Sequence, residues 1–152
     1  AAYNLTADTD GNDPWVHNNS IAWVGGFDVD LPISNMNVNI QETGTYTLAN
    51  DKIGGAYESY DVDYNSDGNY CTNKIVVCVT DSFNHDKVST EVAGIWGIEK
   101  EEYMVMPKVT VNVADDFDIS VSGLYINSEN ENGEFYDYDS NSYVQLAAKY
   151  TF

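Results

Sequence analysis

The sequence predicts an all-β fold, an antiparallel up-and-down barrel of about eight to ten strands in a single domain spanning residues 1–152. Apolar residues alternate with polar or small ones along most of the chain, and no stretch shows a helical period. Residues 36–48 keep the alternation for longer than a globular strand needs. A tight turn at 114–116 contrasts with a long acidic loop at 127–141. A soluble antiparallel β-sandwich would show the same alternation and stays open as the alternative.

The first part of the chain contains one short and three longer predicted strands. They cover residues 3–7, 21–31, 36–48 and 53–64. In the third of these, one face is wholly polar, whereas the other face is apolar apart from Glu42 and Gly44. Such a strand separates two different environments.

The second part of the chain contains four clear strands and one ambiguous segment. The clear strands cover residues 88–98, 103–113, 117–125 and 142–152, and the ambiguous segment covers 71–80. Pro107 interrupts the third strand from the end and removes one hydrogen bond between strands. We therefore expect Pro107 at a sheet edge, a bulge or a strand end.

The two cysteines, Cys71 and Cys78, decide how the ambiguous segment is interpreted. On a continuous strand they would lie about 23 Å apart, because each residue advances the chain by about 3.3 Å. A disulfide needs Cα atoms within about 7 Å of each other. Either the segment is a strand with two thiols, or it is a loop closed by a Cys71–Cys78 disulfide. We predict the disulfide, because it gives an even number of strands and suits an exported protein.

The last strand carries the strongest signal in the chain. Its alternate residues are apolar and end on an aromatic: Val144, Leu146, Ala148, Tyr150 and Phe152. This stretch resembles the C-terminal strand of bacterial outer-membrane β-barrels, whose terminal Phe is read by the assembly machinery. The resemblance implies a transmembrane barrel in the bacterial outer membrane, with membrane lipid around it.

In such a barrel, one face of each strand meets lipid and the other lines the interior. The shared phase of the alternation predicts five lipid-facing residues: Trp23, Val38, Val111, Val121 and Leu146. It also predicts seven pore-lining residues: Asp28, Asp30, Asn37, Asn39, Gln41, Lys108 and Lys149. The chain has no Arg and few Lys to pair with buried carboxylates, so a C-terminal part of a larger, water-filled barrel stays open beside a complete small one.

The charge balance points to cations as partners. Twenty-five acidic residues against six Lys give a formal net charge of −19. Nucleic acid binding requires clustered basic residues and is therefore excluded. We predict a porin-like passive channel that prefers cations, or a structural surface protein, either of which could form homo-oligomers. The alternative is a secreted acidic β-sandwich that binds a ligand, with calcium as a candidate cofactor.

The candidate metal ligands are Asp63, Asn65 and Asp67. Together with Gly68 they match the start of a calcium-binding loop, in which alternating oxygens converge on the ion. The twelfth position is Lys74 instead of the usual Glu, so a complete EF-hand is excluded and a polar hairpin loop is the competing interpretation. We predict no enzymatic activity, because His85 lies too close in sequence to Ser82 and Asp86 to form a catalytic triad.

Overall fold

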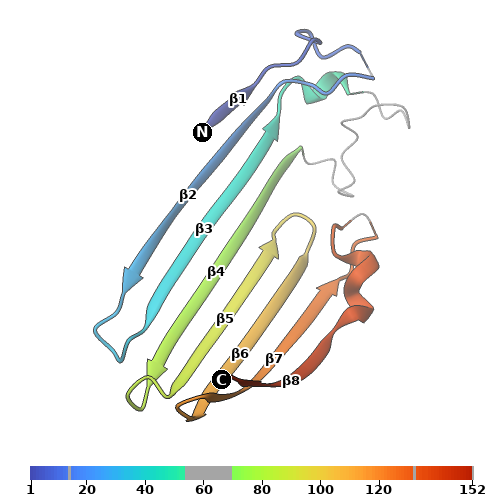
Figure 1. Ribbon diagram of the computed structural model, residues 1–152. Coiled ribbons are helices and arrows are strands. Elements are labelled where there is room, and N and C mark those ends of the chain that lie inside the picture. The colour runs from blue at the N-terminus through green and yellow to red at the C-terminus, as the bar shows by residue number, and fades with distance from the viewer. Residues whose placement is uncertain (14, 54–69, 132, 152) are drawn as a thin grey trace.

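A computed structural model describes residues 1–13, 15–53, 70–131 and 133–151, which form one antiparallel sheet of eight strands in sequence order (Figure 1). The strands are β1 (Ala2–Asn4), β2 (Ser20–Asp30), β3 (Asn37–Thr47), β4 (Cys71–Phe83), β5 (Val88–Gly97), β6 (Glu102–Ala114), β7 (Phe117–Ser128) and β8 (Tyr143–Tyr150). Two short 3-10 helices, η1 (Asn50–Lys52) and η2 (Tyr136–Asn141), lie between strands. The predicted all-β, antiparallel, up-and-down architecture is confirmed. The sheet order ends at β1 and β8 without a pairing between them in the described residues, so closure into a barrel stays a prediction.

The register between neighbouring strands gives the sheet one apolar and one polar face. A row of directly opposed residues crosses six strands: Phe27, Ile40, Val77, Gly94, Val105 and Tyr125. Side chains alternate between the two faces along each strand. This row, together with every second residue before and after it on each strand, therefore defines the apolar face. All five residues that the sequence predicts to face lipid lie on it.

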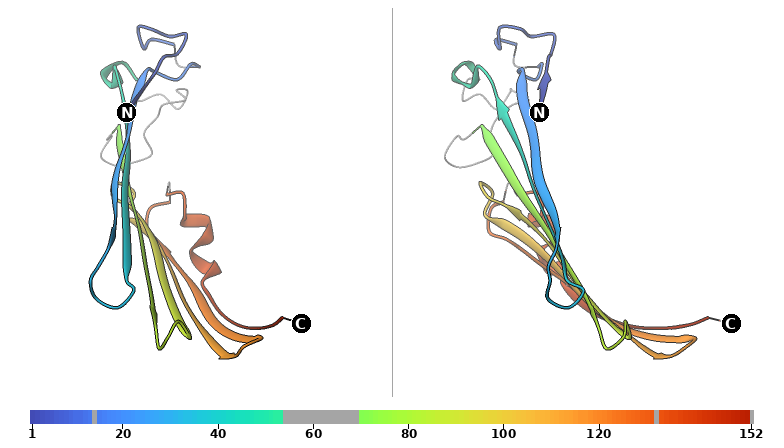
Figure 2. Two further views of the ribbon diagram at one scale, coloured as in Figure 1. Left: turned by 60° about the vertical axis from the view of Figure 1, so that its left-hand side comes forward. Right: turned by 90° about the vertical axis from the view of Figure 1, so that its left-hand side faces the viewer.

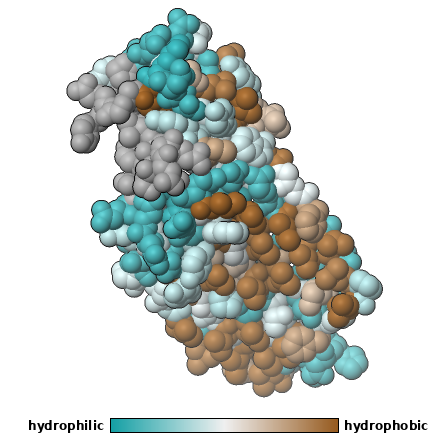
Figure 3. Space-filling view, turned by 180° about the vertical axis from the view of Figure 1, so that it is seen from behind, coloured by the Kyte–Doolittle hydropathy of each residue, from teal (hydrophilic) through white to brown (hydrophobic). Residues whose placement is uncertain are grey.

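Much of the apolar face is exposed among the described residues. Within the described residues, Ile126 is the single buried apolar side chain, at 5% exposure, whereas Val144 and Leu146 are 81% and 72% exposed. Seen from behind the view of Figure 1, apolar side chains form a broad patch over the lower part of the sheet (Figure 3). Broad exposed apolar patches are typical of surfaces that bind another protein, a membrane or a ligand.

Aromatic side chains lie toward both ends of the apolar face. At the end with the short turns, Phe117 is directly opposed to Tyr150. At the other end, Trp96 is opposed to Tyr103, whose ring centroid lies 5.9 Å from that of Tyr125. Phe117 and Tyr125 are eight residues apart on β7, or about 26 Å along the strand. Mainly Val, Ile and Leu occupy the space between the two aromatic groups.

The connections at the two ends of the sheet differ in length. Short turns at 31–36, 84–87 and 115–116 join strands at one end. At the other end the connections after Asn4, Thr47 and Ser128 are longer, and a short turn at 98–101 joins β5 to β6 (Figure 1). One short turn contains three successive left-handed residues, Asn84, His85 and Asp86, with φ of 56°, 57° and 62°. These residue types tolerate that conformation better than most. The predicted strand over 53–64 lies outside the described residues apart from residue 53.

Two interruptions of the apolar face of β3 are explained by one residue of β2. Trp23 is directly opposed to Gly44, and its indole occupies the space that a side chain there would fill. The indole nitrogen donates to both carboxylate oxygens of Glu42, at 2.9 and 3.1 Å. Gly44 therefore makes room for the ring, and Glu42 satisfies its N–H group.

The expected position of Pro107 is wrong. Pro107 lies inside β6, with β5 on one side and β7 on the other, away from an edge, a strand end or a register shift. It is paired with Val92 of β5, whereas the pairing with β7 lapses between Val105 and Lys108. Gly123 lies across from it, and a Cβ there would be 3.5 Å from the proline ring. A central proline is tolerated because only the pairing with β7 lapses beside it, whereas the pairing with β5 continues.

The predicted Cys71–Cys78 disulfide is also wrong. Both residues belong to the continuous strand β4, and no disulfide joins them. Their odd separation places them on opposite faces, with Cys71 opposite Tyr46 on the apolar face and Cys78 opposite Asn39 on the polar face. The β-branched run at 75–77 favours the strand, and pairing with both β3 and β5 holds it extended.

A glycine pair on the apolar face tests the packing of Trp23. We expect Gly44→Ala to lower the free energy of unfolding by about 1–3 kcal/mol, because the new Cβ would lie 2.1 Å from the indole. Gly25→Ala is the matched control, since a Cβ there meets nothing within 4 Å. Denaturant unfolding followed by tryptophan fluorescence measures both. Equal effects of the two substitutions would contradict the packing of Trp23 over Gly44.

The cysteine assignment predicts two thiols that react. Alkylation of the unfolded protein without reductant, followed by mass spectrometry, should add two labels to each chain, because the cysteines lie on opposite faces of one strand. Protein treated first with reductant serves as the control and should take up the same number of labels. If the labels appeared only after reduction, the alternative of a loop closed by a Cys71–Cys78 disulfide would be supported instead.

Candidate functional site

The polar face brings together all seven predicted pore-lining residues. By register, Asp28, Asp30, Asn37, Asn39, Gln41, Lys108 and Lys149 share this face. The sheet is curved, and η2 lies on the inner side of the curve (Figure 2). Because the segment containing η2 is bonded to polar-face residues, the polar face is the inner one. That these residues line a pore stays a prediction.

Two carboxylates of the polar face are held by neutral amides. The side-chain nitrogen of Asn37 donates to Asp28 Oδ1 at 2.6 Å and to Asp30 Oδ1 at 3.0 Å. Asn39 donates to Asp28 Oδ2 at 3.0 Å, and Gln41 donates to Asn39 Oδ1 at 3.3 Å. The three amide residues alternate along β3, so their side chains form a ladder beside the two aspartates of β2. Amides fix the carboxylates in place without cancelling their negative charge.

The two predicted lysines lie near other acidic groups of the same face. Lys108 is directly opposed to Glu91, and both line a pocket of about 240 Å³. Lys149 is directly opposed to Asp118, which accepts a hydrogen bond from Asn112 at 3.0 Å. Each lysine is thus placed across from a carboxylate, and the aspartates of β2 keep amide partners instead.

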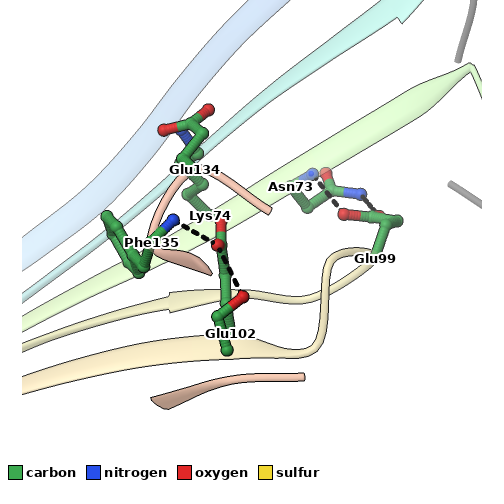
Figure 4. Close-up of polar contacts among 7 residues, drawn as sticks. Asn73, Lys74, Glu99, Glu102, Glu134 and Phe135 are labelled. Carbon is green, nitrogen blue, oxygen red and sulfur yellow. Dashed lines mark hydrogen bonds and ion pairs between the residues drawn. The ribbon is translucent and has the colours of Figure 1, made fainter. Parts of the chain in front are cut away.

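A second polar cluster, which the sequence did not predict, lies at the opposite end of the polar face (Figure 4). Glu102, at the start of β6, has no exposed surface. Its Oε2 accepts a hydrogen bond from the backbone N–H of Phe135 at 2.9 Å. Lys74 of β4 forms an ion pair with Glu134 at 2.5 Å. In sequence, Glu102 looks like part of a charged turn after β5, and its burial depends on a segment about thirty residues away, so no local signal could have found it.

The candidate calcium ligands Asp63, Asn65 and Asp67 lie outside the described residues. Another oxygen-rich turn begins at Asp8, whose carboxylate accepts backbone N–H groups from Asp10, Gly11 and Asp13 at 2.7 to 3.2 Å. Its oxygens therefore stabilise the turn itself. In the part of the chain that the structure describes, no three acidic, histidine or cysteine side chains gather closely enough to hold a metal ion.

The searched part of the chain contains no helix with the length and apolar character required to cross a membrane.

Comparison with known proteins adds no relative. No protein-family model matches the chain, and neither a curated protein nor a solved structure is similar to it. The functional argument therefore rests on the two faces of the sheet.

Proposed function

We propose that this sheet forms part of the wall of a transmembrane β-barrel in the bacterial outer membrane, and that the barrel is a porin-like, passive channel with a preference for cations. The observation that carries the proposal is the exposed apolar face with aromatic residues toward both ends. Outer-membrane barrels have an apolar outer band about 25 Å tall, flanked by two aromatic girdles. The spacing of about 26 Å along β7 is close to the height of such a band for an upright strand, and a tilt of about 40° reduces the spanned height to about 20 Å.

The edges of the sheet support closure with further strands. All eight residues of β8 are exposed, and β1 pairs with only Ser20, Ile21 and Ala22 of β2. Unpaired strand edges invite further pairing, and in a bilayer each backbone group must find a partner within the protein. A barrel that contains further strands, or a homo-oligomer, would satisfy these edges. Both arrangements keep the polar face inside.

Cation preference follows from the charges of the proposed interior. Asp28 and Asp30 hold negative charge that amides leave intact, and the chain as a whole carries −19. Negative charge along a narrow aqueous passage concentrates cations and repels anions. The selection acts through charge alone, so we expect little discrimination between one small cation and another.

A pair of neighbouring substitutions on β8 tests which face meets lipid. Leu146→Arg should reduce the stability of the barrel in lipid vesicles by about 2–4 kcal/mol, because it places a charge in the apolar band. Gln145→Arg introduces the same group on the polar face and should cost much less. Folding into vesicles is measured by the shift in gel mobility between unboiled and boiled samples.

Two results would contradict the proposal that the apolar face meets membrane lipid. One is a chain that purifies as a soluble monomer without detergent, since its apolar face would then need no lipid. The other is an equal response to arginine at positions 145 and 146 in vesicles. Leucine and glutamine at these positions are both exposed, so neither substitution has to disrupt a packed interior.

Reversal potentials in planar bilayers test the cation preference. Replacing Asp28 and Asp30 together by Asn should lower the ratio of cation to anion permeability. The effect should be larger at 0.01 M salt than at 0.1 M, because the screening length falls from about 30 Å to about 10 Å. Glu42→Gln removes one charge from the apolar face and should leave the ratio nearly unchanged. A folded barrel that prefers anions, or that conducts nothing, would contradict the channel and leave a structural surface protein.

A further inference from the structure

Glu102 is the most unusual charged residue of the described chain. It is fully buried, and its Oε1 atom has no hydrogen-bond partner among the described residues. Its Oε2 atom accepts from the Phe135 N–H at 2.9 Å and from the Ser128 hydroxyl at 3.5 Å. A buried carboxylate is costly, so its one strong hydrogen bond, to the backbone of a distant segment, indicates what it holds in place.

The position of Glu102 depends on Gly97. A row of opposed residues on the polar face runs from Lys74 through Gly97 and Glu102 to Ser128. A Cβ on Gly97 would lie 3.0 Å from Glu102 Cγ and 3.1 Å from Oε1. The Glu102 side chain therefore lies flat over the glycine, in the gap between Lys74 and its own strand.

Two consecutive residues of the connection between β7 and β8 are held at this row. Glu134 binds the Lys74 ammonium through both carboxylate oxygens, at 2.5 and 2.6 Å, and Phe135 binds Glu102 through its backbone N–H. The two anchors come from different strands, β4 and β6, and converge on one point of the connection (Figure 4). Beyond that point, η2 packs on β7, where Ile126 is buried on the polar face.

We propose that Lys74 and Glu102 form a two-point latch that holds the segment 133–141 over the polar face. The ion pair is partly exposed, with Lys74 and Glu134 side chains at 33% and 61%, whereas the Glu102 contact is buried. The buried contact fixes the backbone, and the exposed ion pair orients it toward β4. If the polar face lines a channel, as proposed above, the latched segment narrows that channel; the latch itself does not require conduction.

Hydrogen exchange of the Phe135 amide tests the latch in the folded full-length chain in detergent micelles. Glu102→Ala should speed this exchange about tenfold or more, because the N–H group loses a charged acceptor. Glu102→Gln keeps an acceptor oxygen and should restore most of the protection. Lys74→Met and Glu134→Gln should each speed exchange by a smaller factor, and their double variant should do no more than either alone. Glu131→Gln, an exposed charge change in the same connection between β7 and β8 but outside the segment 133–141, is the control.

The outcomes separate the latch from the proposed channel. Unchanged Phe135 exchange in folded Glu102→Ala, or additive effects of Lys74→Met and Glu134→Gln, would overturn the latch. With a latch present, single-channel conductance should rise in Glu102→Ala and in Lys74→Met but not in Glu131→Gln. If the barrel conducts but neither Glu102→Ala nor Lys74→Met changes its conductance, the segment does not narrow the channel. The latch itself would then still stand. Faster exchange in a barrel that does not conduct would support the latch and overturn the channel.

Discussion

The register between strands is the constraint on which the rest of this structure depends. Each strand alternates between two kinds of side chain, and a slip of one residue in any pairing would exchange its faces. The pairings from β1 to β8 keep one phase throughout, apart from a single shift beside the turn at 115–116. The sheet consequently has two continuous surfaces and almost no interior, with Ile126 its one buried apolar side chain in the described residues. Burial of apolar side chains among the described residues therefore contributes little to the stability of the sheet.

Departures from the alternation are matched by partners on neighbouring strands. Glu42 and Gly44 interrupt an apolar face, but together they accommodate the indole of Trp23. Pro107 interrupts the pairing of β6 with β7, and Gly123, which has no side chain, lies across from its ring. In both cases the residue that disturbs one strand fits a feature of the next strand. Such pairs keep the sheet continuous without restoring ideal alternation.

The carboxylates of the polar face have two kinds of hydrogen-bond partner. Near the short turns, Asp28 and Asp30 accept hydrogen bonds from the amides of β3, which hold the two carboxylates without neutralising their charge. Near the long connections, the carboxylate of Glu102 is buried and holds a backbone amide of another segment. One group of carboxylates thus sets an electrostatic environment, and another organises the chain above it. A protein with six Lys and no Arg can carry these carboxylates because amides and backbone groups replace basic side chains as partners.

The sequence by itself determined most of the strands, their up-and-down order and the face to which most of their side chains belong, but it predicted a loop where β4 lies. A period of two is a local property, and turn residues such as those at 115–116 make neighbouring strands antiparallel. It predicted β2, β3 and β5 to β8 within a few residues, and it placed the seven polar candidates on one face. Only the tertiary structure decided the rest. Cys71 and Cys78 are held apart by pairing of β4 with β3 and β5, Pro107 keeps its pairing with β5 while that with β7 lapses, and Glu102 is buried by a segment that begins after Ser128. Each of these outcomes depends on contacts between residues distant in the chain, and alternation along a single strand carries no information about them.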